Sequence, residues 1–171
     1  MREPRSLIIG ADGAAPLAVA ALLDMLSYAR EQTLLAVANL TVEQLDHRHD
    51  AESNSIASLL AHIAAVEAWY QTNTFENRDW TDAEEQQWAG AVDLGVGAPP
   101  DGHALDFYVK MLGDVREKTI AELRHRDEAW LLRVEPLGST TANNYWKWFH
   151  VCEDEINHRG QIRWLRKRLP V

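Results

Sequence analysis

The sequence contains a single cysteine, Cys152, among its 171 residues. One cysteine cannot form an intramolecular disulfide, and a structural zinc site built from several cysteines is excluded as well. A lone thiol is typical of reducing compartments, so we expect a cytoplasmic location. We interpret Cys152 as a small core residue, because the sequence shows no base that would activate it as a nucleophile.

Basic residues are in the minority, since 17 Lys and Arg stand against 26 Asp and Glu and give a formal net charge of −9. Nonspecific nucleic-acid binding relies on many cationic contacts to phosphates, and a polybasic membrane anchor needs clustered Lys and Arg. We therefore expect neither a nucleic acid nor a membrane as a partner. The negative charge is most simply an aid to solubility.

Long apolar runs are also absent, because no stretch approaches the roughly 20 apolar residues of a membrane-spanning helix. The start of the chain, "MREPRSLIIGADGAAPLAVAALL", is interrupted by Asp12 and Gly13 and is not expected to be a secretory signal. There is no internal repeat, no low-complexity tract and no strand pattern. The apolar share of 46% suits a globular chain. We expect a single domain over residues 1–171, with its core from about residue 16 to 168.

Four long segments have the apolar periodicity of amphipathic helices. Pro16 suits the first turn of the first one, and Pro170 follows the end of the last one. The segments cover about 16–40, 55–73, 104–126 and 141–168. They predict an all-α protein built as a four-helix bundle.

The connections between these helices contain turn signals. Thr41 and Thr81 each precede a Gln or Glu by three residues, which is the spacing of a capping box; it predicts a short helix or turn after Thr41 and a short helix around residues 82–88. The Gly- and Pro-rich stretch before residue 104 is predicted to be a loop. Residues 127–139 are predicted to form an irregular crossover that Pro136 and Gly138 end.

Polar residues interrupt the apolar faces of two predicted helices. Asp154 and His158 are four residues apart, so their side chains share one face of the last helix. His62 borders the core-facing side of the second helix. Two imidazoles and one carboxylate form a known ligand set for Zn, Ni or Fe(II). Three protein ligands also leave coordination positions open, as in catalytic sites.

The same residues have a simpler explanation. A buried His bonded to an Asp is a common structural device, and an i, i+4 pair stabilises a helix by a few tenths of a kcal/mol without any metal. Among the other histidines, His150 lies four residues before Asp154 and is a reserve ligand. The remaining ones are assigned to a polar loop or to helix ends: His47, His49, His103 and His125.

Two further residues in these helices need an explanation. Gly160 costs about 0.5–1 kcal/mol relative to Ala inside a helix, so we expect another helix or a ligand to approach closely beside His158. Glu67 lies one position off the face that carries His62. We expect its side chain to point to water or to cap a neighbour.

The segments "NSIASLLAHIAAVEAWY" and "HVCEDEINHRGQIRWLRKRL" together resemble the DinB-like superfamily. That superfamily includes metal-dependent thiol transferases and mycothiol-dependent maleylpyruvate isomerases, and the resemblance is greatest to its small bacterial proteins. It covers about residues 16–168. The resemblance implies an up-down-down-up four-helix bundle, a homodimer, and one divalent metal held by three side chains.

The ligand positions transfer residue by residue. His62 matches the histidine of the second helix, and His158 matches the histidine of the "HRGQ" motif. The position four before it is commonly His in the superfamily and is Asp154 here. This difference implies a harder and more anionic site. Gln161 and Arg159 are expected to bind the cofactor by orienting an anionic group.

The resemblance implies a metal-dependent transferase that acts on a small-molecule substrate with a thiol cofactor such as mycothiol or bacillithiol. The sequence indicates no catalytic side chain beyond the ligands. Two alternatives stay open. One is a non-catalytic metal-binding or stress-related bundle. The other is a metal-free interaction module in which His62 pairs with Asp154 or His158.

Overall fold

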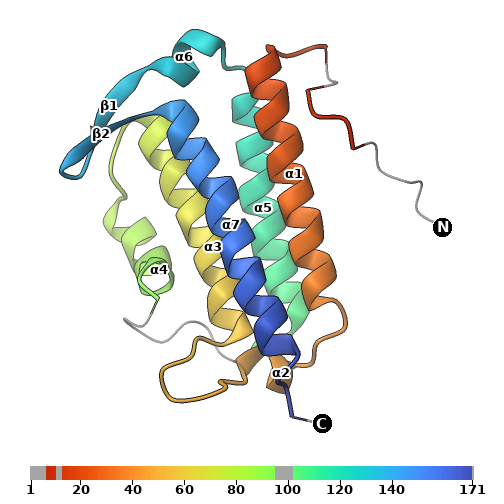
Figure 1. Ribbon diagram of the computed structural model, residues 1–171. Coiled ribbons are helices and arrows are strands. Elements are labelled where there is room, and N and C mark those ends of the chain that lie inside the picture. Colours follow the sequence, from red (N-terminus) through yellow and green to blue (C-terminus); the bar gives the residue numbers. More distant parts are fainter. Residues whose placement is uncertain (1–6, 11–12, 95–101, 171) are drawn as a thin grey trace.

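The computed structural model describes residues 7–10, 13–94 and 102–170. Its four long helices are α1 (Leu17–Val37), α3 (Ile56–Gln71), α5 (Leu105–Leu123) and α7 (Asn144–Arg166). They pack lengthwise as a bundle in which α1 and α7 run one way and α3 and α5 run the other way (Figure 1). The prediction of an all-α bundle with up-down-down-up order is therefore confirmed.

The short helices lie in the connections between the long ones. They are α2 (Val42–Asp46), α4 (Asp82–Val92) and α6 (Glu128–Leu132). The hydroxyl groups of Thr41 and Thr81 accept the backbone N–H of Gln44 and Glu84, so both predicted capping boxes are present. The predicted loop before residue 104 falls largely on residues 95–101, which lie outside the described part of the chain.

The expectation that the chain has no strands is wrong. Strands β1 (Val134–Leu137) and β2 (Thr140–Asn143) form an antiparallel hairpin, with Leu137 opposite Thr140. Gly138 has a φ of +57°, the left-handed conformation that two-residue hairpin turns require. Strands of four residues are too short to reveal a period of two. Because β2 occupies Thr140–Asn143, α7 begins at Asn144 and not at about residue 141.

A second unexpected element extends α3. A π-helical turn, η1 (Thr72–Glu76), continues α3 and ends at Asn77, whose φ is +52°. The hydroxyl of Thr74 donates to the Tyr70 carbonyl at 2.6 Å, which satisfies a backbone group where the helical pattern changes. None of the described helices is long and apolar enough to cross a membrane.

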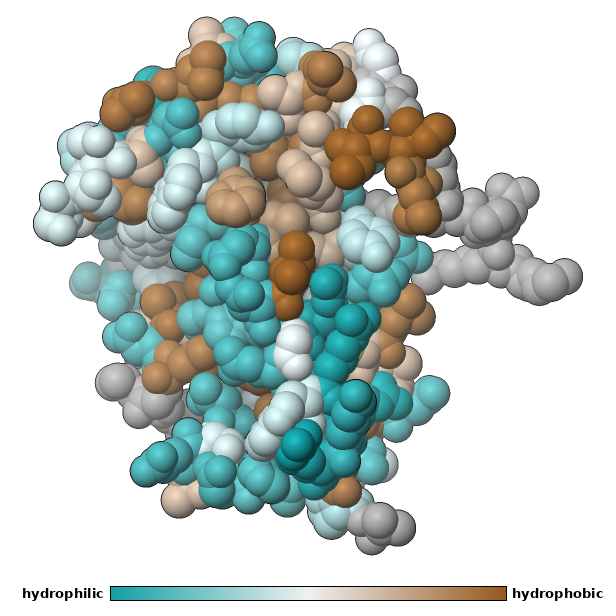
Figure 2. All heavy atoms as spheres, in the orientation of Figure 1, coloured by the Kyte–Doolittle hydropathy of each residue, from teal (hydrophilic) through white to brown (hydrophobic). Residues whose placement is uncertain are grey.

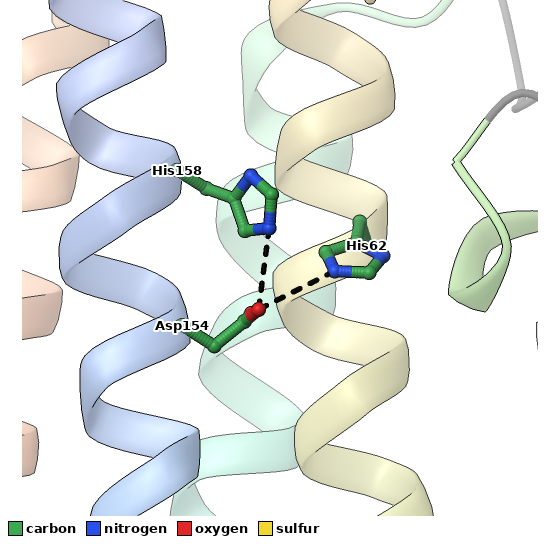
Figure 3. A group of neighbouring side chains, drawn as sticks. All are labelled: His62, Asp154 and His158. Atoms are coloured by element: carbon green, nitrogen blue, oxygen red, sulfur yellow. Dashed lines mark ion pairs between the residues drawn. The ribbon is translucent and has the colours of Figure 1, made fainter.

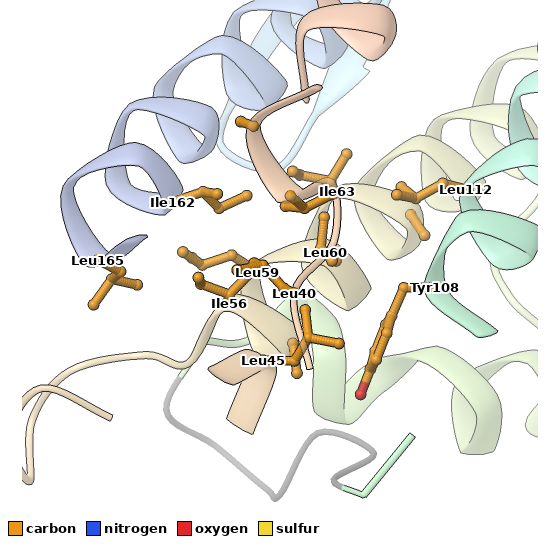
Figure 4. Packing of buried hydrophobic residues seen from close by; sticks show 14 of the residues in the cluster. Leu40, Leu45, Ile56, Leu59, Leu60, Ile63, Tyr108, Leu112, Ile162 and Leu165 are labelled. Atoms are coloured by element: carbon orange, nitrogen blue, oxygen red, sulfur yellow. The ribbon is translucent and has the colours of Figure 1, made fainter. Parts of the chain in front are cut away.

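Apolar side chains fill the bundle in two large clusters. One cluster centres on the first half of α3 and includes Leu59, Leu60 and Ile63 together with Ile162 of α7 (Figure 4). The other lies toward the opposite end and includes Leu22, Leu26, Trp148 and Cys152. Cys152 is 6% exposed, in agreement with its predicted place in the core.

Four charged side chains also meet in the interior, one from each long helix. They are Arg30 of α1, Glu67 of α3, Arg116 of α5 and Glu155 of α7, and all four are buried. Arg116 donates to Glu67 at 2.6 and 2.9 Å and to Glu155 at 2.9 Å. Arg30 donates to the same two carboxylates at 2.9 Å. The two guanidinium groups thereby tie α3 to α7.

The expectation that Glu67 points to water is wrong. Helix α3 packs against α4, α5 and α7, and 14 of its 16 residues are buried, so it has almost no solvent face. Burial by itself would raise the pKa of Glu67. The adjacent Arg116 and Arg30 overcome that effect and lower this pKa to about 2. Glu67 is therefore a buried anion with paired charges.

Candidate metal centre

The structure brings the three predicted ligands together between α3 and α7. His62 extends from α3, while Asp154 and His158 extend from α7 toward it (Figure 3). The Asp154 Oδ1 atom lies 3.2 Å from His158 Nε2 and 3.6 Å from His62 Nε2. One donor atom from each residue lies within 4.8 Å of the others. Such a cluster has the donor types and the spacing of a divalent-cation site.

The orientation of His62 is fixed from outside the cluster. Its Nδ1 atom lies 2.9 Å from the backbone carbonyl oxygen of Ala91 in α4. A carbonyl only accepts hydrogen bonds, so Nδ1 carries a proton, and in the neutral ring the lone pair is on Nε2. Nε2 is the ring atom that faces Asp154. Metal-binding histidines commonly donate their second N–H to a backbone carbonyl in this way.

The charge distribution favours a cation at this position. Burial would raise the pKa of Asp154, but hydrogen bonds and charge interactions with His158 and His62 hold that pKa well below its usual range. Burial would lower the pKa of His62. Asp154 and the carbonyl of Ala91 outweigh this effect and raise it. The carboxylate is thus ionised, and it attracts positive charge between the rings.

The residues fit a divalent cation on independent structural grounds. The His62 and His158 rings meet edge to face with centroids 4.6 Å apart, so both Nε2 atoms face the same carboxylate. The Nδ1 atom of His158 is buried and has no hydrogen-bond partner among the described residues. The three side chains are 11–14% exposed, so the cluster is close to the surface but mostly covered.

His150 does not join the three residues. Its Nδ1 atom lies 3.2 Å from the hydroxyl oxygen of Tyr70, and its ring stacks on Trp146. Burial and the negative charge of Asp154 raise the pKa of Tyr70 to about 12. Tyr70 is therefore a neutral hydroxyl group near the cluster. Sequence reasoning missed it, because it lies two turns from His62 among ordinary apolar residues.

The two residues expected to bind a cofactor lie in different surroundings. Gln161 is exposed and follows His158 by three residues on the same side of α7. Arg159 is partly buried, and its Nη1 atom is 3.4 Å from the carbonyl oxygen of Ala29 on α1. The structure therefore places Gln161, and not Arg159, on the α7 face that carries the cluster.

The explanation of Gly160 by a close helix is wrong. A Cβ atom placed on Gly160 would have no neighbouring atom within 4 Å among the described residues. Of the other histidines, His49 packs edge to face on Trp164 and His103 stacks on Phe107. Within the described residues, His62, Asp154 and His158 are the one group with the spacing of a metal site.

The fold and this cluster define the class of the protein as a DinB-like four-helix bundle with a candidate metal centre between α3 and α7. The family model of the mycothiol S-transferases matches residues 21–170. Because this match covers most of the chain, the chain belongs to the mycothiol S-transferase family.

A solved structure with the same fold is that of a conserved protein from Enterococcus faecalis. It has a TM-score of 0.63 and 16% sequence identity, and the likeness covers 85% of this chain and 93% of the other. At this identity the likeness shows the fold alone. No curated protein matches the chain.

Proposed function

We propose that the protein is a metal-dependent transferase that transfers a small thiol such as mycothiol to an electrophilic small molecule. The observation that carries this proposal is the convergence of His62, Asp154 and His158, with their donor atoms within 4.8 Å, in a chain of the mycothiol S-transferase family. His62 and His158 supply neutral imidazole nitrogens, and Asp154 supplies an anionic oxygen.

Each residue has a separate task in this proposal. A bound Zn, Ni or Fe(II) ion would supply Lewis acidity that lowers the pKa of the thiol. Ala91 holds His62 in the tautomer that presents Nε2. Asp154 offsets part of the cationic charge and orients both rings. Tyr70 contributes a neutral hydroxyl group beside the cluster, which suits hydrogen bonding and not proton abstraction.

A cobalt-substituted protein tests the proposal directly. Addition of mycothiol should produce a sulfur-to-cobalt charge-transfer absorption band, because three protein ligands leave a position for the thiol. The His150→Ala variant is the matched control and should give the same band, since His150 bonds Tyr70 and not the cluster. If the protein binds cobalt but its absorption spectrum does not change when mycothiol is added, the non-catalytic metal-binding alternative is favoured.

We further propose that residues 1–171 act as one cytoplasmic domain that forms a homodimer. Support comes from a groove at α1 and α7 that is lined by Met25, Tyr28, Phe149 and Ile156, with the chain's own residues 7–9 along one side. Three of these side chains are large apolar groups that are 42–52% exposed. Figure 2 shows strongly apolar residues at the upper right of this face, over the segment of residues 7–10 beside α1. A second copy would cover that surface.

The dimer is tested by the Ile156→Arg variant in light scattering coupled to gel filtration. A charge in an apolar interface should raise the dimer dissociation constant by at least about tenfold, which corresponds to about 1.4 kcal/mol. Val109→Arg is the control, because Val109 is similarly exposed but lies on α5. If Val109→Arg dissociates the dimer and Ile156→Arg does not, the interface lies elsewhere.

A further inference from the structure

A hollow of about 520 Å³ lies at the junction of α1 and α5. These two helices are neighbours in the bundle, but they pack less extensively than α1 with α7 or α3 with α5 (Figure 1). The long helices contact one another in the cyclic order α1, α7, α3, α5. The junction of α1 and α5 is therefore opposite the junction of α3 and α7, which holds the candidate metal centre.

Two buried arginines form the inner wall of this hollow. Arg30 of α1 is 7% exposed and Arg116 of α5 is 5% exposed, and both line the hollow. The Nη1 atom of Arg30 donates to the backbone carbonyl of Leu112 on α5. The Nη1 atom of Arg116 donates to the backbone carbonyl of Leu26 on α1. The two guanidinium groups thus cross the gap between α1 and α5 in both directions.

Each of these Nη1 atoms has hydrogen-bonding capacity left over. An arginine Nη1 bears two N–H groups, and within the described residues each donates to the one carbonyl only. The other bonds of Arg30 and Arg116 run through Nε and Nη2 to Glu67 and Glu155. Two N–H groups at the gap therefore remain available, and a buried donor is stabilised when it gains an acceptor.

The buried charges are also separated by sign. Arg30 and Arg116 come from α1 and α5, whereas Glu67 and Glu155 come from α3 and α7 on the other side of the bundle. Both arginines are among the described residues that line the hollow, and neither glutamate is. The network is neutral as a whole, but its positive side borders the hollow. Charge-assisted hydrogen bonds are roughly twice as strong as neutral ones, so this wall favours an anion.

The remaining walls are mainly apolar. Leu34 of α1 and Val109 and Ile120 of α5 line the hollow. Gly113 lies among them inside α5, where glycine weakens a helix. A Cβ atom on Gly113 would meet nothing within 4 Å in the described structure, so a side chain here would occupy space in the hollow. Apolar walls with a few polar groups at one place are typical of small-molecule sites, and the volume lies in their usual range.

We propose that the hollow between α1 and α5 binds a small carboxylate that carries an apolar body. A planar carboxylate has two oxygens that can accept the two remaining Nη1 N–H groups of Arg30 and Arg116. The apolar body then packs against Leu34, Val109 and Ile120. This second ligand site depends neither on the metal nor on the thiol transfer proposed above.

The test uses phenylacetate as the probe in isothermal titration calorimetry of the full chain. Phenylacetamide has a similar shape without the charge, and acetate has the charge without the apolar body. Phenylacetate should bind at least about tenfold more tightly than either of them. Its affinity should be equal in metal-free and zinc-loaded protein, because the two sites lie at opposite junctions of the bundle.

The hollow itself is tested by the Gly113→Leu variant, since changes at Arg30 or Arg116 would also disturb the core. The leucine side chain should fill the hollow and lower the affinity for phenylacetate at least about tenfold. The melting temperature should not fall, because leucine is the better helix former and its Cβ meets no neighbour. The matched control is Gly160→Leu, another exposed helical glycine with open space at its Cβ in the described structure, but on α7. It should bind phenylacetate as the wild type does.

Two exposed charges at the rim give a second test with opposite signs. Arg124 and Glu117 both line the hollow and are exposed, so each can be neutralised without disturbing the core. Arg124→Gln should weaken phenylacetate binding by about two- to fivefold, and Glu117→Gln should strengthen it by a similar factor. Neither variant should alter the affinity for phenylacetamide, which carries no charge.

Several results would overturn the inference. Equal binding of phenylacetate and phenylacetamide would show that the guanidinium groups have no part in binding. Undiminished affinity in Gly113→Leu would place the probe elsewhere, and binding that requires zinc or is lost in His62→Ala would place it at the metal centre. A change of oligomeric state in Gly113→Leu would make the hollow a contact between subunits. Phenylacetate binding that meets all the expectations would establish the site even when mycothiol does not change the cobalt spectrum.

Discussion

Replacement of Arg116 by Met should lower the free energy of unfolding by about 3–5 kcal/mol. Arg116 is 5% exposed and donates to both Glu67 and Glu155. Without it, two fully buried carboxylates would share the single positive charge of Arg30. The remaining unpaired charge has no access to water and must be desolvated in the folded state. Urea unfolding followed by circular dichroism measures the change.

The matched control is Arg78→Met. Arg78 also binds two carboxylates, those of Glu76 and Glu84, but its side chain is 38% exposed. Exposed ion pairs contribute little to stability, so the free energy of unfolding of this variant should remain close to that of the wild type. If Arg78→Met and Arg116→Met lower the free energy of unfolding equally, burial does not determine how much the charge network contributes to stability.

A double variant separates the destabilisation caused by the unpaired charge from the destabilisation caused by lost contacts. Glu67→Gln removes one buried negative charge and keeps the shape of the side chain. Combined with Arg116→Met, it leaves Arg30 and Glu155 as a neutral pair that is joined at 2.9 Å. The double variant should therefore lose less stability than the sum of the two single ones, with a coupling of about 0.5–3 kcal/mol. Strict additivity would contradict a shared network.

The long helices could be predicted because each has an apolar period. The short helices α2 and α4 could be located because Thr41 and Thr81 form the capping boxes that their spacing predicted. The hairpin could not be predicted in this way. Its strands have four residues each, and β2 pairs with β1 through backbone groups that are independent of side-chain type. Gly138 was a turn signal, but a glycine alone does not distinguish a hairpin from a loop.

The position of Glu67 shows a limit of helical periodicity. A helical wheel centred on His62 places Glu67 off the inner face. That placement would be correct for a helix that packs against its neighbours on one side only. Helix α3 is covered by α4, α5 and α7, so nearly every position is interior. The partners Arg30 and Arg116 lie 37 and 49 residues away in the sequence. Spacing within one helix does not reveal them.

Spacing along the sequence predicts only part of the candidate site. The i, i+4 relation places Asp154 and His158 together on any helix. His62 joins them because α3 and α7 pack in antiparallel directions, which followed from the resemblance and not from the spacing. The contact of His62 with Ala91 depends on how α4 folds back against α3. No short motif encodes that contact, yet it determines the tautomer of His62.

The His62→Ala and His158→Ala variants should each weaken zinc binding by more than about 100-fold. Loss of an outer contact to a metal ligand typically costs 10–100-fold, and loss of a ligand should cost more. Elemental mass spectrometry of protein purified without an affinity tag or chelator should find about one metal per wild-type chain. Competition with a chromophoric chelator then gives the affinity of each variant.

Asp154 provides the most discriminating comparison, because one substitution should abolish zinc binding and another should retain it. Asp154→Asn keeps the shape but removes the charge that holds both imidazoles, so it should lose metal almost as completely as His62→Ala. Asp154→His supplies a third imidazole at the position that is commonly His in the superfamily, and it should retain zinc. His150→Ala should bind like the wild type, since His150 bonds Tyr70. Undiminished metal in both His62→Ala and Asp154→Asn would show that the three residues are a buried polar group and not a metal centre.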